Sequence, residues 1–253
     1  MYNHGNCKIA SAPVMKVNGT NCTDKKIIAN SFNKYFTGVV SRLYEAIGFN
    51  VQKLSPTSAS SHYHSTHSFK FERVSENDVK TKLRNLKTGK ASGLDDIPAR
   101  LLKDSSNIVA SPLTKIINTS LTQGIFPSDW KCARVIPLFK KGKSDEMDNY
   151  RPISVLPTFS KIMEKIIHAQ FSKYLTNHHL LTPYQCGFRK FHSTETAVLP
   201  LTDTIGKNVD LGMLTGAVFI DLRKAFDSVN HTLLLDKIRS CGVRVISQTA
   251  SKP

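Results

Sequence analysis

The sequence contains no run of about 18 apolar residues and no lipid-attachment motif at either end, so it predicts neither a membrane-spanning helix nor a membrane anchor. Residues 1–16 also lack the apolar segment of a secretory signal peptide. We therefore expect an intracellular protein, cytoplasmic or nuclear, that is not secreted and has no membrane partner.

The sequence contains few cysteines, and their spacing suggests no pairs. The five cysteines lie far apart, and none forms a Cys-x-x-Cys pair. An odd, scattered set argues against a disulfide framework and against a zinc site, and it favours free thiols in a reducing compartment.

Acidic side chains are also scarce. There are 35 Lys and Arg residues against 19 Asp and Glu residues, which gives a formal net charge of +16. This excess is larger than solubility requires and indicates a polyanionic partner, with nucleic acid as the first candidate. The 253 residues are 40% hydrophobic, which is enough to bury a core in one or two domains.

Residues 1–68 are predicted to be a helical N-terminal segment followed by a flexible linker. Residues 1–25 are polar and weakly patterned. After them, apolar side chains recur at helical spacing, at Ile27, Ile28, Phe32, Tyr35, Phe36, Val39, Val40 and Leu43. Residues 55–68 are rich in Ser, His and Thr without a hydrophobic period, which is typical of a linker. No carboxylate or cysteine accompanies His62, His64 and His67, so a metal site is not expected there.

Further helices are indicated by apolar periodicity and by capping residues. Ser75-Glu-Asn-Asp78 resembles a capping box, and Gly124 is a typical helix end. The predicted helices cover residues 76–88, 99–103, 111–123 and 159–175, and one more begins near Ser193 or Thr194.

A basic segment follows Trp130. Residues 135–139 are predicted to be extended, residues 140–143 to form a hairpin-like turn, and residues 149–154 to form a second extended piece. Pairing of the two pieces would place Lys140 and Arg151 close enough to grip one phosphate group. Simple solvated surface charge is the alternative interpretation.

Residues 183–194 are predicted to be a basic, glycine-containing loop that leads into a helix. Its aromatic side chains alternate with Arg189 and Lys190. Such a pattern can stack bases while neutralising phosphates, although alone it is a weak signal.

Residues 217–221 are an apolar run that ends in Asp221, and a polar turn and a helix are predicted after it. This arrangement can present a carboxylate at the tip of a sheet, or Asp221 can simply end a strand and cap a turn. Phe226 could equally be a core residue. Asp227 is expected to begin the following helix rather than to bind a metal. An aspartyl phosphatase is excluded because its second acid would fall on Arg223.

Several of these motifs together resemble a known family. They are Gly93-Leu-Asp-Asp-Ile-Pro98, Val135-Ile-Pro-Leu-Phe-Lys-Lys141, Asn149-Tyr-Arg-Pro-Ile-Ser154, Gln185-Cys-Gly-Phe-Arg189 and Phe219-Ile-Asp-Leu-Arg-Lys-Ala-Phe-Asp227. In this order the set is similar to the reverse transcriptase of jockey-like non-LTR retrotransposons. The resemblance covers residues 75–243, and residues 25–45 more loosely.

The resemblance implies an α+β fold: the fingers and the start of the palm of a right-hand polymerase over residues 75–243, preceded by the helical N-terminal segment. Residues 244–253 do not resemble the family. The implied partners are an RNA template, a DNA primer and deoxynucleoside triphosphates.

The resemblance also implies roles for individual residues. Asp221 would bind two Mg²⁺ ions, and the carbonyl of Leu222 would bind one of them. Phe226 would lie under the sugar and exclude a 2′-hydroxyl. The nucleotide would also contact Lys140, Arg151, Arg189, Lys224 and Ala225, and nucleic acid would contact Lys131, Arg134, Lys141, Lys143 and Lys190.

One departure from the family limits the expected activity. Its polymerases need a Tyr/Phe-x-Asp-Asp hairpin, which these 253 residues do not contain. Leu94-Asp95-Asp96 is no substitute, because it precedes the fingers and lies in a loop. We therefore expect template-directed polymerisation to be the ancestral activity and the chain alone to be inactive. The alternatives are a non-catalytic, basic RNA-binding protein, or a chain that does not fold because its partial sheet has an open edge.

Overall fold

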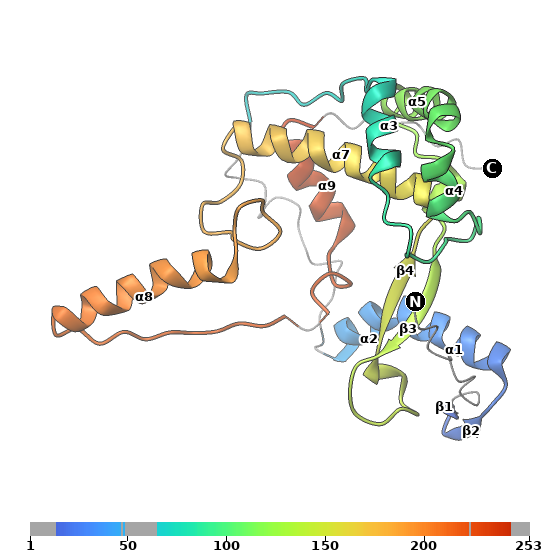
Figure 1. The fold of residues 1–253 in the computed structure, drawn as a ribbon. Coiled ribbons are helices and arrows are strands. Elements are labelled where there is room, and N and C mark those ends of the chain that lie inside the picture. The colour runs from blue at the N-terminus through green and yellow to red at the C-terminus, as the bar shows by residue number, and fades with distance from the viewer. Residues whose placement is uncertain (1–13, 47, 49–64, 223, 244–253) are drawn as a thin grey trace, which may run out of the picture. The chain divides into compact units, whose positions relative to one another are not determined.

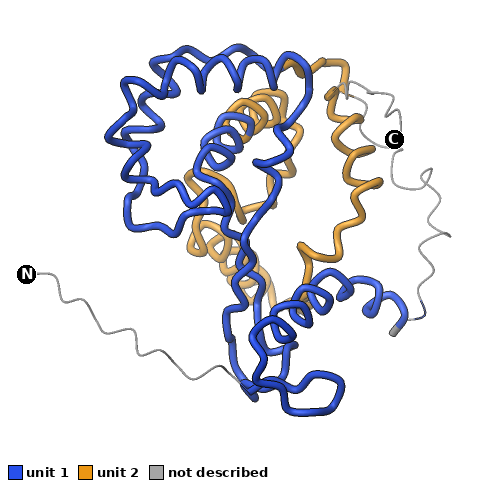
Figure 2. Tube along the Cα trace, turned by 90° about the vertical axis from the view of Figure 1, so that its right-hand side faces the viewer, with its two compact units in different colours: residues 1–55, 71–167 blue, residues 56–70, 168–253 orange. Residues whose placement is uncertain are grey.

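The computed structural model describes residues 14–46, 48, 65–222 and 224–243, and it combines helices with short strands (Figure 1). The chain divides into two compact units (Figure 2): unit 1 is residues 1–55 with 71–167, and unit 2 is residues 56–70 with 168–253. None of the described helices is long and apolar enough to cross a membrane.

Helices form the main core of unit 1. They are α3 (Glu76–Arg84), α4 (Ala99–Asp104), α5 (Ser106–Gln123) and the first part of α7 (Thr158–Asn177). Their apolar faces meet because apolar residues recur every three or four positions. The buried side chains are Val79, Leu83, Leu102, Ala110, Leu113, Ile117, Ile162, Met163 and Ile166.

The helix boundaries follow the local chemistry only in part. The capping box is confirmed, since the Asp78 amide donates to the Ser75 hydroxyl at 3.1 Å and the Ser75 amide donates to the Asp78 carboxylate at 3.2 Å. Helix α3 ends at Arg84 instead of residue 88, because the Leu86 amide bonds the Leu83 carbonyl in a tighter turn. Helix α5 ends at Gly124, which has a φ of 70°, as predicted.

The predicted start of α5 at residue 111 was wrong. The helix begins at Ser106 and contains Pro112 in its interior. Proline removes one helical hydrogen bond. Here the helix continues through it, because Ala110 and Leu113 are buried on either side.

The predicted pairing of the basic segment is confirmed. Strand β3 (Arg134–Phe139) pairs antiparallel with β4 (Tyr150–Val155), in a register that runs from Arg134 opposite Val155 to Phe139 opposite Tyr150. A short helix, α6 (Ser128–Lys131), precedes the ribbon, and a 3₁₀ turn, η3 (Met147–Asn149), lies in its connection.

The N-terminal segment of unit 1 contains a hairpin that the sequence analysis missed. Strand β1 (Met15–Val17) pairs with β2 (Thr20–Cys22). Asn18 and Gly19 connect the strands with φ of 51° and 84°. Positive φ at both positions is what Asn-Gly hairpin turns favour.

Two helices follow this hairpin where one was predicted. Helix α1 (Lys25–Thr37) begins at Asp24, whose carboxylate accepts the Lys26 and Ile27 amides. It ends at Gly38, and α2 (Val39–Ala46) follows. Their predicted helical character is confirmed, and the glycine divides it.

Unit 2 contains the rest of α7, α8 (Thr194–Asp210) and α9 (His231–Ser240). Helix α8 begins at Thr194, within the predicted range, and Ser193 caps it. The expected helix-entry role of Asp227 was wrong, because Asn230 occupies the cap position and its side chain accepts the Leu233 amide at 3.2 Å.

Residues 65–68 are held in place in unit 2, so the linker prediction was wrong for them. The Ser65 amide bonds the Ser240 carbonyl at 2.9 Å. The Tyr174 hydroxyl donates to the carbonyls of His67, at 3.1 Å, and Cys241, at 2.7 Å. The rest of the predicted linker, with His62 and His64, lies outside the described residues, as do residues 244–253.

The predicted strand over residues 217–221 was also wrong. Residues 213–222 have no assigned strand or helix, and Figure 1 draws them as a long run of coil after α8. Val218, Phe219 and Ile220 are 88, 86 and 81% exposed. Within the described residues no strand pairs with this run, and an extended segment without a partner has no ladder of hydrogen bonds to define it as a strand.

Candidate functional site

The β3–β4 ribbon has two chemically different faces. Leu138 lies opposite Arg151, and the Lys140 amide donates to the Asn149 carbonyl at 2.8 Å. Side chains two residues apart on a strand share a face, so Lys140 and Arg151 project from the same side, as diagonal neighbours about 7–8 Å apart. One phosphate group can therefore meet both cations.

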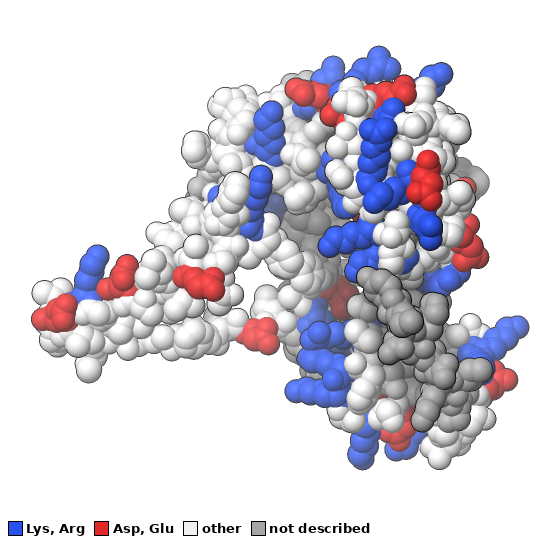
Figure 3. All heavy atoms as spheres, in the orientation of Figure 1, with Lys and Arg blue, Asp and Glu red and all other residues white. Residues whose placement is uncertain are grey.

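This face is open to solvent. Leu138, Ile136 and Ile153 lie on it and are 55, 43 and 43% exposed, and Lys140 and Arg151 are exposed as well. Figure 3 shows Lys and Arg side chains over the elements of unit 1 around the ribbon. The face thus offers positive charge beside aliphatic surface.

The other face is anchored to the N-terminal segment. The rings of Phe139 and Tyr150 are 5.4 Å apart, and Tyr150 meets Phe32 of α1 edge-on at 5.1 Å. Phe32 in turn forms a small core with Met15 and Ile28. Because one face is anchored in this way, the face that bears Lys140 and Arg151 is directed away from the N-terminal segment.

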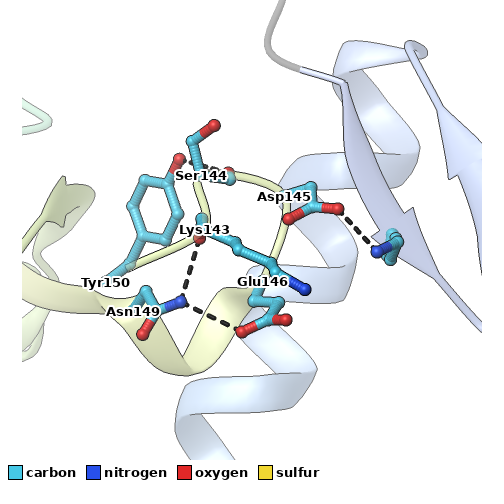
Figure 4. Close-up of polar contacts among 7 residues, drawn as sticks. Lys143, Ser144, Asp145, Glu146, Asn149 and Tyr150 are labelled. Atoms are coloured by element: carbon cyan, nitrogen blue, oxygen red, sulfur yellow. Dashed lines mark hydrogen bonds and ion pairs between the residues drawn. The ribbon is translucent and has the colours of Figure 1, made fainter. Parts of the chain in front are cut away.

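The turn of the ribbon is braced from within (Figure 4). The Asn149 side-chain amide donates to the Lys143 carbonyl at 2.9 Å and to the Glu146 carboxylate at 3.1 Å. The Tyr150 hydroxyl donates to the Ser144 carbonyl at 2.7 Å. Gly142 has a φ of 92°, and a Cβ there would lie 2.7 Å from the Asn149 side chain, so the turn requires glycine.

The acidic side chains of the turn are engaged. Lys16 Nζ lies 2.7 Å from Asp145 Oδ2, and the Tyr35 hydroxyl donates to Asp148 Oδ1 at 2.5 Å. The hydrogen bond and charge of Lys16 lower the pKa of Asp145, and Asp145 raises the pKa of Lys16 by the same interactions.

The basic side chains of the turn remain exposed. In the part of the chain that the structure describes, Lys140, Lys141 and Lys143 form no ion pair. The turn therefore presents its cations outward while its acidic groups bond the N-terminal segment or the turn itself.

Arg134 is committed to an internal ion pair. Its Nη2 lies 2.8 Å from Asp96 Oδ1, in the loop over residues 89–98. Gly93 of the same loop packs against the start of α7, and a Cβ there would lie 2.5 Å from the Pro157 backbone nitrogen. The loop thus fixes the base of the ribbon, whereas Lys131 is exposed at the end of α6.

Unit 2 holds the other predicted site residues. Asp221 and Leu222 are exposed, and Lys224 and Ala225 lie in a turn where the Ser228 amide bonds the Lys224 carbonyl at 3.0 Å. Phe226 is 78% exposed and meets Phe188 edge-on, with ring centroids 5.7 Å apart.

Arg189 is turned towards its own loop. Its Nη1 donates to the carbonyls of Thr182, at 3.0 Å, and Gln185, at 3.3 Å. Lys190 Nζ lies 4.6 Å from the centre of the Phe191 ring. Arg189 therefore shapes the loop, while Lys190 lies beside an exposed aromatic ring.

The residues present do not assemble a divalent-ion site. No group of three or more His, Cys, Asp and Glu side chains clusters among the described residues. Asp221 is exposed and belongs to no such group among the described residues, which does not fit the two-ion arrangement that the resemblance implies.

The sequence analysis missed the residues that brace the turn. Lys16, Asp145 and Asp148 were not singled out, and Tyr35 was named only as a position on a helix face. Asn18-Gly19 is a strong hairpin signal that would have predicted β1 and β2. The ion pair between Asp96 and Arg134 joins residues 38 positions apart, and no sequence pattern indicated it.

Comparison with known proteins agrees with the motifs. The family model for "Reverse transcriptase (RNA-dependent DNA polymerase)" matches residues 139–251. The chain is 34% identical over 163 residues, or 64% of its length, to a probable RNA-directed DNA polymerase from transposon BS of Drosophila melanogaster, of which it covers 18%.

Two further relatives show the same pattern. The chain is 32% identical over 170 residues, or 66% of its length, to the RNA-directed DNA polymerase from mobile element jockey of Drosophila melanogaster, and it covers 18% of that protein. It is 26% identical over 127 residues, or 50% of its length, to a Pol polyprotein from the R2 element of Popillia japonica, of which it covers 17%. The chain thus spans less than a fifth of each of these relatives.

Proposed function

The chain is a reverse transcriptase sequence of the jockey-like, non-LTR retrotransposon kind, and we propose that it contributes nucleotide and template binding to RNA-directed DNA synthesis. In this proposal residues 75–243 supply the fingers and the start of the palm of a right-hand polymerase, and the helical N-terminal segment precedes them. The partners are an RNA template, a DNA primer and deoxynucleoside triphosphates.

The observation that carries the proposal is the common face of Lys140 and Arg151 on the β3–β4 ribbon. A lysine ammonium is a compact point charge, whereas an arginine guanidinium is a planar fork that can bond two phosphate oxygens. The two together can neutralise and orient a triphosphate. The engaged acids of the turn support the same role, because they leave the exposed charge positive.

In the proposal Asp221 is a ligand for divalent metal ions, but the described residues do not form a complete site for them. Reverse transcriptases use divalent metal ions, and a carboxylate such as Asp221 with the neighbouring Leu222 carbonyl has the oxygen donors that Mg²⁺ prefers. One exposed carboxylate does not hold two ions. The described residues thus support binding and orientation of the nucleotide rather than the transfer step.

A second candidate function is RNA binding without catalysis. The net charge of +16 favours it, since phosphate neutralisation by many cations gives binding that needs no chemistry. It predicts that an RNA duplex and a deoxynucleoside triphosphate compete for binding only because both are negatively charged. The ribbon proposal instead predicts a distinct effect of Lys140 and Arg151 on nucleotide binding.

The test is deoxynucleoside triphosphate binding by the 253-residue chain. Lys140→Gln and Arg151→Gln are each expected to weaken binding about tenfold, because a hydrogen bond to a charged group is lost. Arg151→Lys keeps the charge and is expected to restore only part of the affinity.

Lys103→Gln is the matched control, because Lys103 is an exposed lysine that belongs to α4 and not to the ribbon. It is expected to leave nucleotide affinity unchanged. Equal losses for Lys103→Gln and Lys140→Gln would show that only the overall charge matters and would contradict the ribbon site.

A further inference from the structure

We propose that the loop over residues 182–193 is a stacking site for unpaired bases of single-stranded nucleic acid, formed by Tyr184, Phe188 and Phe191. The inference deepens the proposed function and rests on it for the identity of the strand, which would be the template. The contacts that carry it all lie within unit 2.

The first observation is the exposure of the three rings. Tyr184, Phe188 and Phe191 are 91, 89 and 87% exposed. Aromatic side chains normally bury much of their large surface. Isolated exposed apolar residues need no explanation, but three rings within eight residues form a group. The segment is a loop, so the group is not the apolar stripe of a helix.

The second observation is that two of these rings stand on residues with an unusual backbone conformation. Phe188 and Phe191 have φ of 60° and 64°, in the left-handed region that bulky residues rarely adopt. Such conformations persist where surrounding contacts impose them, and they cluster at functional sites.

The contacts that impose this conformation come from the loop itself. The Arg189 guanidinium bonds the Thr182 and Gln185 carbonyls, and the Gln185 side-chain amide donates to the Gly187 carbonyl at 3.2 Å. Arg189 is therefore a positioning residue: it closes the loop across its width, and the three rings remain exposed to solvent.

The third observation is the charge of the loop, which selects nucleic acid as the occupant. Residues 183–194 contain Arg189, Lys190 and His192 but no acidic residue. Lys190 Nζ lies 4.6 Å from the centre of the Phe191 ring. A base stacked on that ring would bring its phosphate within reach of the ammonium, whereas an apolar protein surface would leave the cation without a partner.

The position of Phe226 connects the stacking site with the proposed nucleotide site. Phe188 meets Phe226 edge-on at an interplanar angle of 87°. The resemblance places Phe226 under the sugar of the incoming nucleotide. A base on Phe188 would then belong to the strand next to that nucleotide.

The test compares two oligomers of equal charge on the full 253-residue chain. Fluorescence anisotropy is measured with a 12-nucleotide single-stranded RNA and with an abasic oligomer that carries the same number of phosphates. The unsubstituted chain is expected to bind the RNA at least about tenfold more tightly, since stacking of even one base contributes that much. The triple variant Tyr184→Ala, Phe188→Ala, Phe191→Ala is expected to bind both oligomers with the affinity of the abasic one.

Two further variants separate stacking from other causes. Phe188→Leu keeps an apolar side chain without a π face and is expected to reduce the preference for RNA; full retention would show that no base stacks on the ring of Phe188 and would overturn the proposal. Leu214→Ala removes a fully exposed side chain, at 101%, outside the loop and is expected to change nothing.

The outcomes are distinct from those of the nucleotide test. No preference of the unsubstituted chain for RNA over the abasic oligomer would overturn the stacking site, and so would an unchanged preference in the triple variant. Nucleotide binding that still depends on Lys140 would in that case leave the proposed function standing.

Discussion

Lys16 Nζ lies 2.7 Å from Asp145 Oδ2, and this ion pair joins β1 to the turn of the β3–β4 ribbon, 129 positions further along the chain. The Lys16 amide also donates to the Asp145 carbonyl at 3.0 Å. The N-terminal hairpin therefore fixes the turn through both side chain and backbone. No site residue was predicted in the N-terminal segment, yet this segment shapes the surface that bears Lys140.

Reversal of the Lys16 charge should loosen the turn. Lys16→Glu places two carboxylates together, and we expect faster hydrogen exchange of the amides in residues 140–149. The double variant Lys16→Asp, Asp145→Lys restores opposite charges and should bring exchange back towards its original rate. Equal exchange in all three proteins would show that the pair does not hold the turn.

Acid should weaken the same contact and the cap of α3. Lys16 lowers the pKa of Asp145, and the Ser75 hydroxyl and amide lower the pKa of Asp78. A carboxyl whose pKa is depressed on folding stabilises the fold above its unfolded pKa of about 3.9, and that stabilisation is lost as pH falls through the folded value.

Denaturant midpoints measured between pH 7 and pH 3 check this expectation. The midpoint should fall on acidification, and Asp78→Asn should reduce the fall because its side chain does not titrate. Lys16 has the opposite sign: its raised pKa means that its contribution is present below about 10.4 and is lost as pH rises through the folded value. A denaturant midpoint that does not change between pH 7 and pH 3 would contradict the lowered pKa of Asp145 and that of Asp78.

Substitutions of Gly93 and Gly89 form a matched pair that tests the packing at the base of the ribbon. A Cβ on Gly93 would lie 2.5 Å from the Pro157 nitrogen, whereas a Cβ on Gly89 would meet nothing within 4 Å. Gly93→Ala should therefore destabilise unit 1 by about 1–3 kcal/mol, because backbone atoms must move. Gly89→Ala should be neutral or stabilise by up to about 1 kcal/mol. Urea denaturation compares them, and equal midpoints would refute the close packing.

The sequence was most informative where local chemistry decides structure. The capping box at Ser75, the Gly124 helix end and the pairing of two extended pieces across a turn depend on nearby residues, and each is confirmed. The anchoring of residues 65–68 by Tyr174 depends on residues more than 60 positions away in sequence, and composition alone indicated a linker.

In the candidate site, too, features set by nearby residues could be predicted and long-range contacts could not. The common face of Lys140 and Arg151 follows from the register of two strands whose pairing, though not whose register, was predicted from the sequence. The partners of Arg134 and Asp145 are tertiary contacts that periodicity does not encode. The Asp221 segment failed as a strand for a related reason: an apolar run specifies a strand only when another strand pairs with it, and none does so within the described residues.

The 253-residue chain alone should not extend a primer. Its sequence contains one candidate metal-binding Asp and no Tyr/Phe-x-Asp-Asp motif, so the carboxylates of a two-ion site are incomplete. A primer annealed to an RNA template, with Mg²⁺ and all four deoxynucleoside triphosphates, checks this by gel electrophoresis. Extension that Asp221→Ala abolishes would overturn the expectation, and extension that survives the substitution would point to a contaminating polymerase.

The ribbon face as a triphosphate site is tested most directly by lysine footprinting. The chain is acetylated briefly with and without saturating deoxythymidine triphosphate, and modification of each lysine is quantified by mass spectrometry. Lys140 should be strongly protected by the nucleotide, while the exposed Lys103 of α4 should be modified equally in both samples. Equal modification of Lys140 with and without the nucleotide would contradict the account.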